Sequence, residues 1–137
     1  MFPGGKNKAL TFSYDDGVEQ DRRLVALLNR YGLKGTFNLN SGMLDKSNHW
    51  SRNGVEIRRM DREGLAELYR GHEIACHTLT HQRLETMQKE EIEREVLLDR
   101  DNLELLSGKP VHGFAYPFGT YNETAVEVLA ANGFGYA

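Results

Sequence analysis

The chain has 137 residues, of which 39% are hydrophobic and 27% charged, and its formal net charge is −3. This length and composition predict one globular domain over residues 1–137 and exclude collagen-like and disordered proteins. The mildly negative charge argues against nucleic-acid binding, the pairs Arg22-Arg23 and Arg58-Arg59 are interpreted as solvated surface, and no apolar run is long enough to span a membrane.

Strand-like and helix-like segments alternate along the chain. A buried strand over 9–13 precedes a helix over 21–31, and a strand over 35–39 precedes a polar loop over 41–53. Asp61 is then expected to cap a helix through Tyr69. In chain order there follow a strand over 72–76, a helix over about 88–106, a strand over 111–115, a helix from its cap at Asn122 to about 131, and the opening of a fifth strand at 134–136.

This alternation predicts an α/β fold with a parallel sheet, because parallel strands need helical crossovers. The sheet is either open or part of a barrel, since a complete eight-unit barrel needs about 200 residues or more. Ligands of such folds bind at the carboxyl ends of the strands. The polar and aromatic residues that end or follow the predicted strands are Asp15, Asp16, Asn38, Asn40, His77, His81, Tyr116 and Phe118.

Two histidines and a pair of carboxylates among these residues can carry chemistry. His77 and His81 are separated by three residues, so a helical turn would place both imidazoles on one side, as a metal ion needs. Taken alone, two histidines at this spacing are more often ordinary surface or core residues than metal ligands. The sequence from Asp15 to Gly17 is as typical of a tight turn as of a functional site. Together they supply three metal ligands, an open position for water and a second carboxylate that can act as a base.

The sequence resembles the polysaccharide deacetylase family, also known as the NodB-homology or carbohydrate esterase 4 domain, over about residues 9–136. The family motif Thr-Phe-Asp-Asp-Gly corresponds to residues 11–17, with Ser13 and Tyr14 as two extra residues. The motif His-Ser/Thr-x-x-His is matched by residues 77–81. The motif Arg-x-Pro-Phe/Tyr-Gly ends at Gly119, with Ala115 in the place of its arginine.

The resemblance implies a partial or distorted TIM-like (β/α) barrel of the NodB type. It implies that Asp16, His77 and His81 bind one divalent metal ion, most often zinc, with cobalt or nickel as alternatives. Asp15 would be the general base, and the backbone N–H of Phe118 would help to hold the oxyanion. The expected reaction removes N-acetyl or, less often, O-acetyl groups from a carbohydrate or a small amide. Candidate substrate contacts are Tyr14, Asn38, Asn40 and Tyr116, and the two asparagines are as well explained by tying down neighbouring loops.

Two alternatives follow from departures from the family pattern. Ala115 leaves the base without its orienting arginine, and the last two family motifs, which supply an acetyl-binding wall and a histidine general acid, do not occur in this sequence. A non-catalytic metal-binding or glycan-binding remnant is therefore the second hypothesis. The third, a glycosidase that uses Asp15 with Glu73, gives the two histidines no purpose. His49, beside Trp50 in the polar loop, is interpreted as an exposed residue.

Compartment and assembly are expectations from the sequence alone. Cys76 is the only cysteine, which excludes an internal disulfide, and we expect it to be a small core residue. The first residues lack the apolar stretch of a secretory signal, so we expect a cytoplasmic protein, or a secreted one if a leader precedes this sequence. A barrel without its last strands would leave a sheet edge uncovered, so we also expect self-association into a homo-oligomer.

Overall fold

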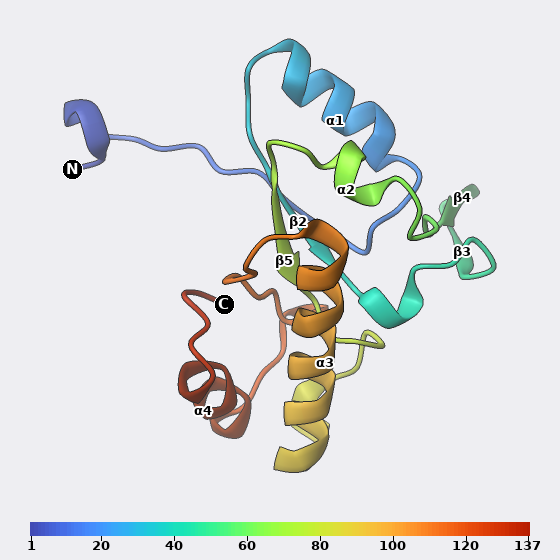
Figure 1. Cartoon of the computed structure of the whole chain (residues 1–137), viewed down its shortest axis with the longest axis vertical. Coiled ribbons are helices and arrows are strands. Elements are labelled where there is room, and N and C mark those ends of the chain that lie inside the picture. The colour runs from blue at the N-terminus through green and yellow to red at the C-terminus, as the bar shows by residue number, and fades with distance from the viewer.

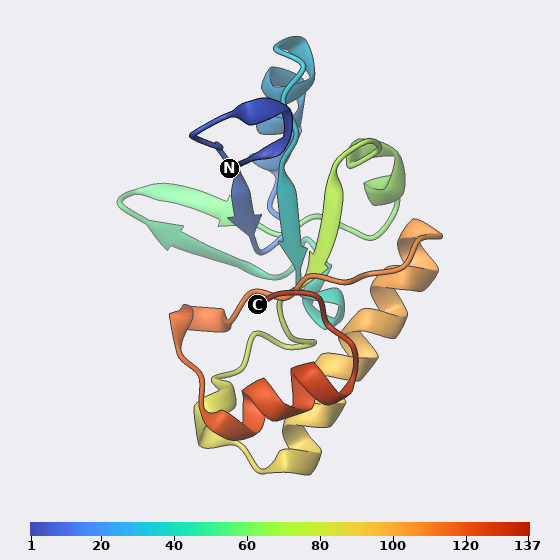
Figure 2. The ribbon, with the colours of Figure 1, turned by 90° about the vertical axis from the view of Figure 1, so that its left-hand side faces the viewer.

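A parallel three-stranded sheet forms the centre of the molecule. The computed structural model describes all of residues 1–137, and its strands β1 (Ser13–Asp15), β2 (Thr36–Leu39) and β5 (Glu73–Cys76) lie in the order β1-β2-β5. Asp15 pairs with Asn38 in the register, so the carboxyl ends of these strands lie level. Figure 2 shows the three strands side by side and running in one direction. The predicted α/β fold with parallel strands is confirmed.

Four α-helices connect and cover the strands (Figure 1). The carboxylate of Glu91 accepts from the N–H of Gln88 at 2.8 Å at the start of α3, and the side chain of Asn122 accepts from the N–H of Ala125 at 2.8 Å at the start of α4. These local caps explain why both helices begin where the sequence predicts. None of the helices combines the length and the apolar character that crossing a membrane requires. Their bounds are α1 (Asp21–Arg30), α2 (Leu65–Leu68), α3 (Lys89–Ser107) and α4 (Glu123–Ala131).

One apolar core joins the sheet to the helices. Phe37 and Leu39 of β2 and Cys76 of β5 are fully buried, and they belong to the same cluster as Ile92 and Val96 of α3. The predicted core position of Cys76 is confirmed. Burial raises the pKa of its thiol, so this cysteine stays protonated and unreactive at neutral pH.

Two segments near the N-terminal half differ from the prediction. The first strand starts at Ser13 and not at residue 9, because the ladder to β2 includes only Ser13–Asp15, and residues 9–11 and 13 are exposed and not buried as predicted. Residues 41–53 are not a loop throughout: β3 (His49–Arg52) pairs antiparallel with β4 (Val55–Arg58). Asn53 and Gly54 join these strands with φ values of 52° and 76°, which is the left-handed geometry that a two-residue hairpin turn requires. This hairpin projects from one side of the molecule in Figures 1 and 2.

Three further predictions are wrong in detail. Asp61 does not cap α2, because its carboxylate pairs with the Lys46 ammonium at 2.6 Å and Gly64 occupies the cap position. Residues 111–115 form no regular strand, although isolated bridges join Cys76 to Phe114 and Gly113 to Tyr136. Residues 134–136 contribute only the second of these bridges. The segment therefore follows the edge of β5 without extending the ladder.

Candidate functional site

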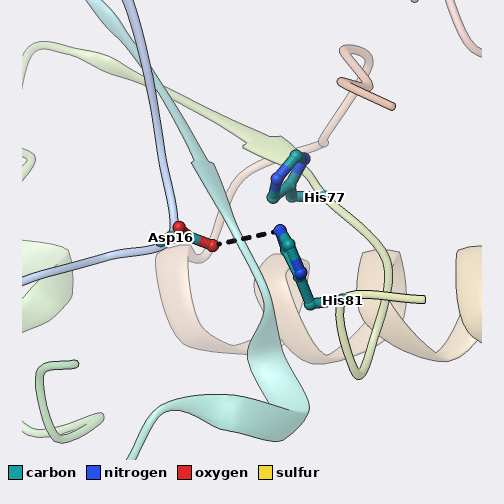
Figure 3. Close-up of side chains that lie close together, drawn as sticks. All are labelled: Asp16, His77 and His81. Atoms are coloured by element: carbon teal, nitrogen blue, oxygen red, sulfur yellow. Dashed lines mark ion pairs between the residues drawn. The ribbon is translucent and has the colours of Figure 1, made fainter. Parts of the chain in front are cut away.

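Three side chains with metal-ligating atoms converge at the carboxyl end of the sheet (Figure 3). Asp16 follows β1, whereas His77 and His81 follow β5. One ligand atom from each residue lies within 4.8 Å of those of the other two, and Asp16 Oδ1 is 3.5 Å from His81 Nε2. Burial lowers the pKa of His81, and the charge of Asp16 partly offsets this effect, so the imidazole favours the neutral form that binds metal ions.

The two histidines do not lie on a helical turn, so the predicted helical geometry of this segment is wrong. Residues 77–81 form a loop in which Thr78 and His81 adopt left-handed backbone geometry, with φ values of 65° and 59°. Asn40 holds this loop by donating to the carbonyl groups of His77 and Thr78. Glu95 of α3 accepts from the Thr80 N–H at 2.8 Å and from its hydroxyl at 2.9 Å. Tertiary hydrogen bonds therefore fix this loop, and the centroids of its two imidazole rings lie 5.0 Å apart.

His77 is held in the tautomer that a metal ligand needs. Its Nδ1 lies 2.8 Å from the carbonyl oxygen of Ala115. A carbonyl oxygen can only accept, so Nδ1 carries the proton and Nε2 keeps its lone pair. Metal-binding histidines commonly orient their free nitrogen in this way. Because the contact uses the main chain of residue 115, the missing arginine side chain does not weaken it.

Asp99 of α3 connects the ends of β2 and β5 from beneath the site. The residue is fully buried, its Oδ1 accepts from the Ser41 N–H at 2.7 Å, and its Oδ2 accepts from the His77 N–H at 3.0 Å. Burial raises the pKa of Asp99 to about 7, although these hydrogen bonds favour the ionised form. Asp99 thus fixes the backbone from which His77 projects.

Arg59 is a site residue that the sequence analysis missed. It was interpreted as solvated surface, but it is buried, and its Nη2 lies 2.9 Å from Asp16 Oδ1. Its Nη1 donates to the Asp16 carbonyl at 2.6 Å and to Asn40 Oδ1 at 2.7 Å. Burial lowers the pKa of Arg59, and the adjacent Asp16 carboxylate opposes this effect. Strand alternation after the Asn53-Gly54 turn is the signal that separates Arg58 from Arg59, because it sends them to opposite faces.

Asp15 lies beside the three clustered side chains and has a different partner. Its side chain is exposed, and its Oδ1 accepts from Asn38 Nδ2 at 2.7 Å. Asn38 is buried and also donates to the Ser13 hydroxyl at 2.8 Å, so its amide is fixed. Ser13 and Tyr14 lie within β1 and pair with β2, so they are not an insertion that displaces Asp15. The Tyr14 ring packs on the core residue Phe37, with centroids 6.1 Å apart.

The two aromatic residues in the motif that ends at Gly119 have different neighbours. Phe118 has a φ of 61°, and its ring centroid is 4.7 Å from that of His81, so it borders the cluster. Tyr116 instead packs between aromatic neighbours, 5.2 Å from Phe114 and 5.0 Å from Tyr121. The structure therefore brings Phe118 to His81 and places Tyr116 in an aromatic cluster.

Two residues of the weaker hypotheses lie elsewhere. His49 is exposed on β3, with its Nδ1 3.4 Å from a Glu56 oxygen. Glu73 begins β5, pairs in the register with Thr36, and accepts from the Thr36 hydroxyl at 2.6 Å. Asp15 is two residue steps further toward the carboxyl end, on the far side of β2. These two carboxylates do not flank a common site, so the glycosidase hypothesis has no geometric support.

Asp15, Asp16 and His81 line a single open cleft of about 400 Å³. The hairpin β3–β4 and the segment after β1 supply the rest of its lining. These lining residues are Val18, Trp50, Arg52, Ile57 and Arg59. The cleft therefore combines a carboxylate next to a candidate metal site with an aromatic side chain.

Comparisons with known proteins find one matching family model and several similar solved structures. The family model for polysaccharide deacetylase matches residues 3–137, whereas no curated protein matches the chain. The Streptococcus pyogenes deacetylase PplD in complex with acetate is similar at 20% identity and a TM-score of 0.80, over 95% of this chain and 55% of that one. IcaB from Ammonifex degensii is similar at 20% identity and a TM-score of 0.80, over 94% and 58%. BA3943, a CE4 family pseudoenzyme from Bacillus anthracis, is similar at 18% identity and a TM-score of 0.70, over 95% and 43%.

The chain thus spans about half the length of these solved structures. At identities of 20% or less, the similarity to them establishes a shared fold. The match to the family model covers nearly the whole chain and shows the family directly. This chain belongs to the polysaccharide deacetylase family.

Proposed function

We propose that the chain is a divalent-metal-dependent deacetylase that hydrolyses N-acetyl, or alternatively O-acetyl, groups on a carbohydrate. The observation that carries the proposal is the convergence of Asp16, His77 and His81, whose ligand atoms lie within 4.8 Å of one another. One carboxylate oxygen and two imidazole nitrogens suit zinc, cobalt or nickel and leave a coordination position open. The proton on His77 Nδ1 supports this fit, because it leaves Nε2 free to bind.

The residues around these ligands would divide the work of hydrolysis. When bound, the cation would lower the pKa of a water molecule and polarise the acetyl carbonyl. Asp15 would take a proton from the attacking water as general base, and Asn38 would orient its carboxylate. The backbone N–H of Phe118 would donate to the oxygen on which negative charge develops. Asp15 would then hold the proton that the leaving amine needs.

A non-catalytic metal-binding or glycan-binding domain is the second candidate function. The similarity of the fold to the pseudoenzyme BA3943 favours this candidate, and so does Ala115, which stands where the family motif has an arginine. In this case the same three ligands would bind a cation, and the cleft would hold a glycan without turnover.

The test measures metal content and turnover separately. Purified chain is loaded with zinc, its bound metal is measured by mass spectrometry, and acetate release from acetylated chito-oligosaccharides is followed. We expect one zinc per chain and measurable acetate release. Asp15→Asn should keep the zinc and lose activity by about 100-fold or more, whereas the exposed Asp101→Asn control should lose neither. Zinc binding without acetate release would select the binding domain, and failure to bind a divalent ion would refute both candidates.

A further inference from the structure

One face of the hairpin β3–β4 is directed toward the site. Trp50 pairs with Ile57 in the register, and Arg52 pairs with Val55. Because side chains alternate along a strand, Trp50, Arg52 and Ile57 share a face with Arg59. These four side chains all line the cleft that also contains Asp15, Asp16 and His81. The opposite face carries the ion pairs of Glu56 with its neighbours.

Trp50 contacts Arg59, which pairs with Asp16 of the candidate metal site. The guanidinium carbon of Arg59 lies 5.5 Å from the centre of the Trp50 ring, which is a cation–π distance. Arg59 is itself fixed by Asp16 and Asn40. The indole is only partly buried, so part of its apolar surface remains available within the cleft. A ligand in the cleft would therefore meet an aromatic surface whose orientation is already set.

Arg52 adds hydrogen-bond donors next to this ring. Its side chain is exposed and makes no ion pair within the chain, unlike Arg58 and Arg59. A guanidinium offers five N–H donors in a rigid plane, which suits hydroxyl and carbonyl oxygens. The volume of about 400 Å³ lies in the range of about 300–1,000 Å³ that small-ligand sites occupy.

We infer that the hairpin forms a sugar-binding subsite in which Trp50 stacks on a pyranose ring and Arg52 donates to its oxygens. The ring belongs to the acetylated glycan and lies next to the unit that carries the acetyl group. One face of a pyranose presents mainly C–H groups, which pack well against an indole, while its rim carries hydroxyl groups. The inference rests on the proposed function and adds to it the residues that would hold the neighbouring sugar unit.

Fluorescence gives a test that does not need turnover. Trp50 is the only tryptophan of the chain, so intrinsic tryptophan emission reports on this position alone. We titrate zinc-loaded Asp15→Asn with N-acetylglucosamine and with tetra-N-acetylchitotetraose. The tetramer should change the emission in a saturable way at concentrations at least about fivefold below those that the monomer needs. An emission that neither sugar alters would overturn the inference, whether or not the protein is an enzyme.

Kinetics on active protein separate the subsite from the chemistry. Trp50→Ala should raise KM for the tetramer by about fivefold to tenfold with little change in kcat, because stacking contributes equally to the ground and transition states. Trp50→Phe should recover part of this loss, and Ser51→Ala, on the opposite face of β3, is the matched control. Circular dichroism checks that each variant is folded. An unchanged KM with continuing acetate release would refute the subsite and leave the proposed function standing.

Discussion

Asp21 makes stability depend on pH in a direction that can be worked out from the structure. The residue starts α1, is buried, and accepts a hydrogen bond from the Tyr69 hydroxyl at 2.7 Å. Burial raises the pKa of Asp21 from 3.8 to about 6, and the Tyr69 hydrogen bond limits the increase. The folded protein therefore binds a proton on Asp21 more tightly than the unfolded chain does.

This difference in proton binding determines whether stability rises or falls with pH. Between pH 4 and 6 the folded state holds more protons than the unfolded state, so the contribution of Asp21 to stability falls as the pH rises and is constant above about pH 7. A difference of about 2 pKa units corresponds to about 3 kcal/mol at most. Asp21→Asn keeps the shape and the acceptor for Tyr69 but removes the titration. Relative to the wild type, this variant should gain up to about 3 kcal/mol of stability between pH 4 and pH 7.

The assay is urea unfolding of the chelator-treated protein at several pH values, followed by circular dichroism. The exposed Asp101→Asn on α3 serves as the matched control, because it makes the same chemical change at a carboxyl that is not buried. If the Asp21→Asn difference is constant to within 0.5 kcal/mol, or moves in the opposite direction, burial does not control this carboxyl and the reasoning is refuted.

Two further variants test the supports of the site. Asn38→Ala should lower kcat by about 10-fold or more, because it removes the hydrogen bond that orients Asp15. KM and the zinc affinity should change by less than about twofold, because Asn38 is not a metal ligand. A loss of zinc affinity in a titration would contradict this role. Asp99→Ala should lower the free energy of unfolding by about 2 kcal/mol. Two buried N–H groups lose their acceptor, at a cost of about 1–3 kcal/mol each, and part of this cost is offset because the variant no longer buries a carboxyl group. Urea unfolding beside Asp101→Ala measures this change, and equal stability of the two variants would show that water replaces the lost acceptor.

Features that depend on local sequence could be predicted. The ends of α3 and α4 follow from their caps, and the strand 35–39 follows from its apolar run. The predicted parallel strands indicated that the residues after β1 and β5 would meet at one edge of the sheet, and the family resemblance identified Asp16, His77 and His81 among them. Positions in the chain order are sufficient to predict this meeting because the carboxyl ends of parallel strands lie at one edge of the sheet.

Features that depend on tertiary partners could not be predicted in the same way. The loop from His77 to His81 has positive φ values that Asn40 and Glu95 hold in place, and both partners are distant in the sequence. The burial of Arg59 likewise depends on Asp16, which lies 43 positions earlier. The hairpin is an exception, because the Asn53-Gly54 pair is a local signal that the surrounding polar residues concealed.

The placement of Arg59 would make the two proposed binding equilibria, of the cation and of the sugar, dependent on each other. A single guanidinium touches the carboxylate of Asp16 on one side and the indole of Trp50 on the other. A cation bound by Asp16 would weaken the salt bridge between Asp16 and Arg59 and change the orientation of the indole. By thermodynamic reciprocity, a ligand resting on that indole would alter the affinity for the ion by the same factor.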